Sequence, residues 1–111
     1  MLLIVAVCGC AGGAERAVLD QFFAASRLRD LTALEKVSAV IFEPRQDGTV
    51  LAYDVEWIRK TGDDSEEVLV NATVRMPSGR TERRPLLVTL KRTAEGLRVA
   101  AVRVSTESAS P

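Results

Sequence analysis

Apolar residues in this chain first follow a helical period and then alternate. Between residues 14 and 28, a spacing of about 100° per residue gathers the apolar side chains on one broad face. That face comprises Ala14, Ala17, Val18, Phe22, Ala25 and Leu28, widened by Leu19 and Phe23. Arg16, Asp20 and Arg27 fall together on the opposite side. The pattern predicts an amphipathic helix that lies against a large apolar surface, with Phe22 at the centre of the contact.

A second, shorter helix is expected next. Thr32 followed by Glu35 fits a capping box, so this helix starts near Thr32 and runs to about Val37. Residues 38–42 are β-branched and aromatic enough for a short strand, but they also fit the end of that helix. Pro44 and the polar residues after it predict a turn.

From Thr49 onward the period is two, which is typical of β-strands. In the first strand we expect one face to carry Leu51, Tyr53, Val55 and Trp57, and the other to carry Ala52, Asp54 and Glu56. Three further strands are expected at residues 68–76, 86–91 and 97–104, separated by short polar turns. Pro85 indicates that the third strand starts at or near a sheet edge or a bulge.

Two helices followed by a run of strands predict an α+β fold, with the helices packed on a curved antiparallel meander. We expect a single domain over residues 14–104 and a disordered polar tail at residues 105–111. A chain of 111 residues is long enough for one such domain.

The first ten residues are interpreted as a targeting signal. Residues 2–8 are an unbroken apolar run, too short to span a bilayer. Val7-Cys8-Gly9-Cys10 resembles the bacterial lipobox, in which the last cysteine is lipidated. We therefore expect a signal peptide at residues 1–10, lipid attachment at Cys10 and a glycine-containing tether at residues 11–13. The signal has no Lys or Arg, which departs from the pattern, so a plain signal peptide or a buried N-terminal strand stays open.

Composition excludes several kinds of chemistry from the expected domain. The chain has no histidine, and both of its cysteines lie in the first ten residues. Serine–histidine triads, thiol nucleophiles, disulfide frameworks and the common zinc sites all need these residues. We therefore expect no cofactor and no metal. Carboxylates, lysines and Tyr53 remain as possible acid–base groups, but strand alternation puts most carboxylates on outward faces or in turns, so we expect no catalytic residue.

Charge is balanced overall but unevenly distributed. Residues 11–74 hold 7 basic and 12 acidic side chains, whereas residues 75–103 hold 8 basic and 2 acidic ones. This asymmetry fits an anionic partner, or acidic and basic strands that pair on a solvated sheet face; we favour the pairing. The basic cluster Arg80, Arg83 and Arg84 lacks interleaved aromatic residues, so we expect no nucleic-acid partner. The acidic run at residues 63–67 lacks calcium-loop spacing and is expected to be a solvated hairpin tip.

The order of elements resembles the NTF2-like superfamily, and in particular small bacterial lipoproteins of the DUF4878 type. The resemblance rests on three stretches: Phe22-Phe23-Ala24-Ala25, Arg29-Asp30-Leu31, and the terminal pattern from Val88 to Val99. It covers residues 14–104 and implies a cystatin-like cone of helices closed by a curved sheet. It implies no activity, because this fold carries enzymes, ligand binders and interaction modules.

Enzymes of that superfamily place an acid or base beside a tyrosine inside the cone. Tyr53 and Trp57 are candidate pocket-rim residues here, although packing in the core is the favoured interpretation. Asp54 and Glu56 fall on the other strand face, so we expect no buried carboxylate within about 3.2 Å of Tyr53.

The leading hypothesis is a non-catalytic envelope lipoprotein that contacts another envelope protein and the membrane through its lipid. The alternative is an apolar-ligand carrier or a ketosteroid-isomerase-like or cyclase-like enzyme. A filled core would favour the first, whereas an open pocket with a carboxylate would favour the second. The sequence leaves the oligomeric state open.

Overall fold

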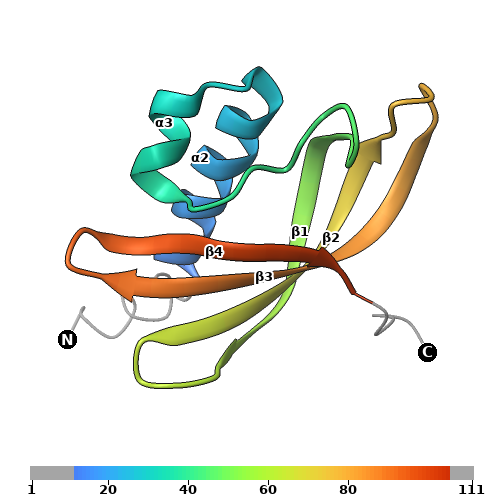
Figure 1. Ribbon diagram of the computed structural model, residues 1–111. Coiled ribbons are helices and arrows are strands. Elements are labelled where there is room, and N and C mark those ends of the chain that lie inside the picture. The colour runs from blue at the N-terminus through green and yellow to red at the C-terminus, as the bar shows by residue number, and fades with distance from the viewer. Residues whose placement is uncertain (1–11, 106–111) are drawn as a thin grey trace, which may run out of the picture.

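The computed structural model describes residues 12–105, which form two helices followed by four strands (Figure 1). The elements are α2 (Gly13–Leu28), α3 (Leu31–Val37), β1 (Thr49–Lys60), β2 (Ser65–Arg75), β3 (Thr81–Thr93) and β4 (Gly96–Val104). The predicted α+β class is therefore confirmed. The proposed signal, Cys10 and most of the expected polar tail lie outside the described residues.

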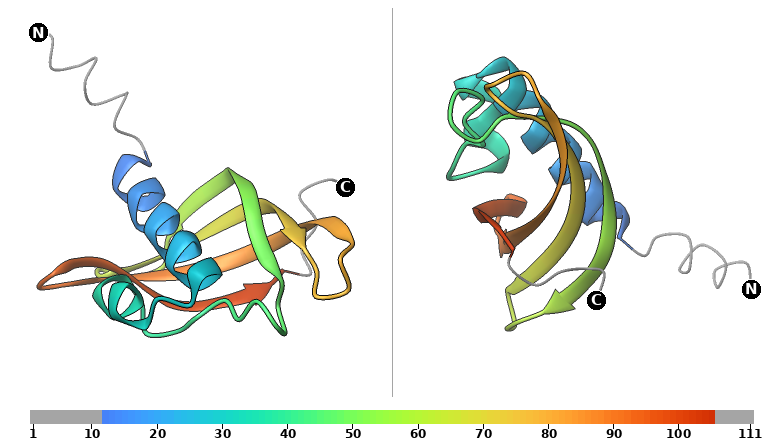
Figure 2. Two further views of the ribbon diagram at one scale, coloured as in Figure 1. Left: turned by 90° about the horizontal axis from the view of Figure 1, so that it is seen from above. Right: turned by 90° about the vertical axis from the view of Figure 1, so that its right-hand side faces the viewer.

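The strands form one open antiparallel sheet in the order β1-β2-β3-β4. Each strand pairs with its neighbours in the sequence, as a meander requires. Short turns suffice to join antiparallel neighbours, and the turns here are tight. The sheet is curved, and both helices lie on one side of it (Figure 2).

The core lies between that side of the sheet and α2. Leu19 and Phe22 have no exposed surface. They belong to one apolar cluster with the side chains that alternate along the inner face of the sheet. The fully buried strand members are Val68, Val70, Ala72, Val74, Leu86, Val88, Leu90 and Val99. The expected core position of Phe22 is confirmed.

Two bulges in β1 change which residues face the core. Val50 pairs with Val74 but Ala52 pairs with Thr73, so Leu51 is an extra residue and is 41% exposed. Such an insertion shifts the strand's alternation by one residue. The predicted common face of β1 is therefore wrong at its first member, because Leu51 does not share the inward direction of Tyr53.

The second bulge turns the Trp57 side chain to the outer face of the sheet. Val55 pairs with Val70, whereas Trp57 pairs with Leu69, so Glu56 is the extra residue. Leu69 lies on the face of β2 opposite to the core residue Val70. The prediction that Trp57 shares the face of Tyr53 and Val55 is wrong, because simple alternation takes no account of a bulge.

The start of α3 also differs from the prediction. Asp30 is the N-cap, and its side chain accepts a hydrogen bond from the Ala33 amide at 3.1 Å. Thr32 is already inside the helix, so the predicted Thr32–Glu35 capping box is wrong. After α3, Ser38 forms a single parallel bridge with Val99 rather than a strand.

Pro85 lies inside β3, which begins at Thr81, and not at the start of that strand. β3 is a central strand, but its pairing with β4 begins only at Leu86. The Pro85 carbonyl accepts a hydrogen bond from the Ser105 amide at 2.8 Å, where that ladder ends. The missing Pro85 N–H therefore falls at the end of a ladder, where proline is tolerated.

Candidate functional site

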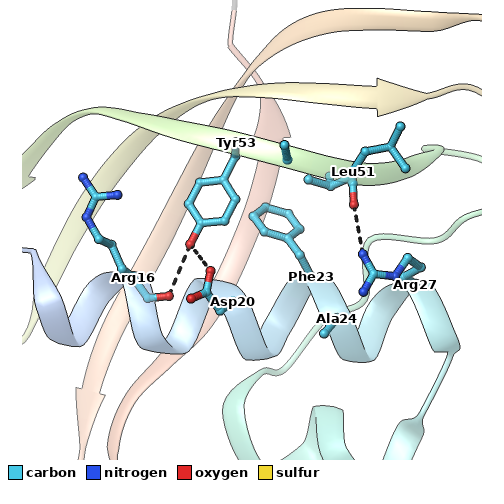
Figure 3. Close-up of a pocket in the computed structure, with 9 residues that line it drawn as sticks. Arg16, Asp20, Phe23, Ala24, Arg27, Leu51 and Tyr53 are labelled. Carbon is cyan, nitrogen blue, oxygen red and sulfur yellow. Dashed lines mark hydrogen bonds between the residues drawn. The ribbon is translucent and has the colours of Figure 1, made fainter.

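A groove of about 410 Å³ separates α2 from the edge strand β1 (Figure 3). Its helix wall carries Arg16, Asp20, Phe23, Ala24 and Arg27, and its strand wall is the bulged stretch at residues 50–53. The helix residues recur at intervals of three and four, so one stripe of α2 faces β1. Sequence analysis assigned Arg16, Asp20 and Arg27 to the side away from the sheet, but this stripe borders the groove instead.

Tyr53 occupies the middle of the groove. Its hydroxyl donates a hydrogen bond to Asp20 Oδ1 at 2.5 Å and also lies 3.2 Å from the Arg16 carbonyl oxygen. Its ring packs against Phe23 at 5.4 Å between centroids. Partial burial and then the bond to the Asp20 carboxylate hold the pKa of Tyr53 well above its ordinary value, against a smaller opposing effect of Arg16. Tyr53 is thus a neutral hydrogen-bond donor throughout the physiological range.

Asp20 is the residue that sequence reasoning missed. The alternation argument weighed only Asp54 and Glu56 of the same strand, whereas the carboxylate comes from the helix. The expectation was restricted to a buried carboxylate, and Asp20 is exposed. The spacing of Arg16, Asp20 and Arg27 as one helical stripe could have indicated that Asp20 faces a strand.

The groove is large enough for a small molecule, but its central donor, the Tyr53 hydroxyl, is already engaged. The Tyr53 hydroxyl has a single proton, which is committed to Asp20. Arg27 Nη1 lies 3.5 Å from the Val50 carbonyl oxygen, too long for a strong bond. A ligand that used Tyr53 as a donor would first have to displace Asp20.

Trp57 lies apart from this groove, on the outer face of the sheet. The Arg59 guanidinium sits 3.8 Å from the centre of its ring, a cation–π contact. In register with it across the sheet are Leu69 and Leu87, which are only 2% and 7% exposed. Tyr53 and Trp57 were predicted to share a pocket rim; they face opposite sides of the sheet and cannot.

The basic cluster at the β2–β3 end carries its own counter-charges. Arg83 pairs with Asp54 at 3.2 Å and also donates to Thr73 Oγ1 at 2.7 Å. Glu82 pairs with Arg84 at 3.2 Å and more loosely with Arg80 at 3.9 Å. The Arg83–Asp54 pair spans β1 and β3, as expected for acidic and basic strands that face each other.

An exposed apolar patch lies at the corner between the two helices. Leu28 is 72% exposed and Leu31 is 63% exposed. Leu31 also borders a shallow depression of about 280 Å³ that α3 forms with residues 38–41, where Val40 is partly exposed. We refer to Leu28, Leu31 and Val40 as the corner patch. Leu28 ends α2 and Leu31 begins α3, and exposed apolar residues that cluster are a common feature of interaction surfaces.

Comparison with known proteins does not identify a family. No family model, no curated protein and no solved structure matches the chain. Neither helix between residues 12 and 105 is long and apolar enough to cross a membrane. The same residues contain no group of three or more carboxylate or thiol side chains that could hold a metal ion.

Proposed function

We propose that this chain is an envelope lipoprotein, anchored through Cys10, whose domain is a non-catalytic protein-interaction module. The observation that carries the module assignment is the filled interior. Phe22 and Leu19 of α2 occupy the space over the inner sheet face and are completely buried. A ligand pocket between α2 and the inner sheet face would need open space that these two side chains occupy.

We also propose that the fold is an NTF2-like cone of the small-lipoprotein type. Support comes from the element order, with two helices followed by a meander, and from the curvature of the sheet (Figure 2). In this proposal the buried phenylalanines of α2 fill the space between the helix and the sheet that would be open in a ligand-binding cone.

The corner patch is the surface proposed to contact a partner. It lies at the C-terminal end of α2, whereas the tether joins the N-terminal end. A helix of 16 residues is about 24 Å long, so the corner patch lies about 24 Å along α2 from the end that the proposed tether joins. The proposed partner is an envelope protein that presents an aliphatic surface bordered by polar groups, because the exposed leucines flank the charged residues Arg29 and Asp30.

Site-specific photo-crosslinking tests this role. A photo-reactive residue at Leu31 should give one discrete adduct in intact cells, identified by mass spectrometry as an envelope protein. The same residue at Ser78, on an exposed turn far from the corner, should not give that adduct. Equal adducts at both positions, adducts to a second copy of this chain only, or no adduct at Leu31 would contradict the proposed partner.

A second candidate is a small apolar-ligand carrier or an isomerase-like or cyclase-like enzyme. The observation that favours it is the Tyr53–Asp20 hydrogen bond beside an open groove. If the groove binds ligands, Tyr53→Phe should change the affinity for a fluorescent apolar carboxylate by tenfold or more, equal to about 1.4 kcal/mol. Saturable binding of that probe, lost in Tyr53→Phe, would make this candidate the better one.

A further inference from the structure

Glu66 is a carboxylate placed where an apolar side chain would be expected. It pairs with Lys60 of β1 and Leu90 of β3, and alternation puts it on the core face of β2 with Val68. Only 6% of its surface is exposed. Its Oε1 accepts no hydrogen bond from an N–H or a hydroxyl group within residues 12–105. The expectation that the whole acidic run is a solvated tip is therefore wrong at Glu66, and a buried acceptor of this kind calls for an explanation.

The first turn of α2 brings a second carboxylate to it. Glu15 lies in that turn, and its side chain is within hydrogen-bond reach of Glu66. The helix start is close to this end of the sheet, because a Cβ on Gly12 would lie 3.3 Å from Ile58 Cδ1. Two carboxylates can form a hydrogen bond only if one of them holds a proton.

The charged groups around Glu15 and Glu66 determine whether a proton or a metal ion lies between the two carboxylates. The bond with Glu15, burial and the Glu15 charge together raise the pKa of Glu66 to about 7, while Arg92 of β3 and Lys60 of β1 oppose the rise. Those two cations also disfavour a metal ion between the carboxylates. A proton neutralises one of the two carboxylates and adds only one positive charge beside Arg92 and Lys60, whereas a divalent metal ion would add two.

We propose that Glu66 holds a proton donated in a hydrogen bond to Glu15, and that this proton latches the first turn of α2 onto the β1–β2 end of the sheet. Loss of the proton leaves the buried Glu66 carboxylate beside the partly exposed Glu15 carboxylate, so their repulsion separates the turn from the sheet. The latch lies at the end of the domain where the proposed tether enters, but it depends neither on lipidation nor on a partner.

The direction of the pH effect follows from proton binding. In the unfolded chain Glu66 titrates near its ordinary value of 4.5, and in the folded domain near 7. Between these values the folded state binds more protons, so stability is greatest at low pH and falls as pH rises through this window. The corresponding rise in the unfolding equilibrium constant is at most about 300-fold over the whole titration and about 140-fold between pH 4.5 and pH 8.

The experiment is urea unfolding of the full chain at intervals from pH 5 to pH 8, combined with amide hydrogen exchange of the first turn of α2. The wild type should lose stability toward pH 8, and the protection of the Arg16 amide, which donates to the Gly12 carbonyl at 2.8 Å, should fall from pH 5 to pH 8 relative to that of the amides around Phe22. Glu66→Gln mimics the protonated side chain and should remove most of this pH dependence. Glu67→Gln, the adjacent residue on the outer face, is the matched control and should retain it.

Glu15→Gln provides an independent arm if Glu66→Gln does not fold. Its amide can donate to a Glu66 carboxylate, so the pH dependence should shrink in this variant too. A wild-type protein whose stability is constant or rises from pH 5 to pH 8 overturns the proposal. Glu66→Gln and Glu15→Gln variants that lose stability in parallel with the wild type overturn it as well.

Discussion

Truncation of Phe22 tests the filled interior on which the proposed interaction role depends. Phe22 has no exposed surface, and its ring makes an edge contact with Phe23 at 5.2 Å between centroids. Phe22→Ala removes a whole ring from the middle of the contact between α2 and the sheet. The surrounding side chains come from several strands, so the site cannot collapse without moving the sheet.

The cost follows from the transfer of the ring and from the cavity it leaves. Buried phenylalanine-to-alanine changes cost about 3–5 kcal/mol. A domain of this size has a total stability of about 5–15 kcal/mol, so much of the margin is lost. With a urea slope of about 1.5 kcal/mol/M, the unfolding midpoint should fall by about 2–3 M.

Urea unfolding followed by circular dichroism is the assay. Gln21→Ala is the matched control, since Gln21 is the preceding residue of the same helix and is exposed. It should change stability by no more than about 0.5 kcal/mol. A Phe22→Ala cost below about 1 kcal/mol, or equal costs for the two variants, would refute the filled core and remove the main support for the interaction role.

Two further predictions concern backbone strain and the groove. Gly48→Ala should destabilise the domain more than Gly79→Ala in the same unfolding assay. Both glycines have φ near +95°, but only at Gly48 would a Cβ meet Val74 Cγ1, at 2.7 Å; equal costs would mean that this contact relaxes freely. Tyr53 is the chain's only tyrosine, so absorbance titration reports it alone. Its ionisation should begin well above pH 10 and shift downward in Asp20→Asn, whereas an unchanged titration would mean that the hydrogen bond is absent in solution.

Periodicity predicted the elements well because each has one strongly apolar face. The helix over residues 14–28 and the alternation of β2 both follow from side chains that must reach one core. Phe22 could be placed by helical phase alone. The α+β class follows from the element order, since two helices before a meander leave few other ways to cover one sheet face.

Features that depend on contacts between distant segments could not be predicted in the same way. The bulges of β1 leave no local signal in the sequence, and one of them moves Trp57 to the outer face. The meeting of Asp20 with Tyr53 and of Glu15 with Glu66 depends on where α2 crosses the sheet. Within the acidic run, only the register of β2 distinguishes the buried Glu66 from the partly exposed Glu67.

The central claim, anchoring of an interaction domain through Cys10, is tested most directly by metabolic labelling with a radioactive fatty acid. The full chain should incorporate label and remain in the membrane fraction after a salt wash, because two or more acyl chains give stable anchoring. Cys8→Ser should keep both properties, and Cys10→Ser should lose the label. Label that persists in Cys10→Ser, or that is lost in Cys8→Ser instead, would contradict the account.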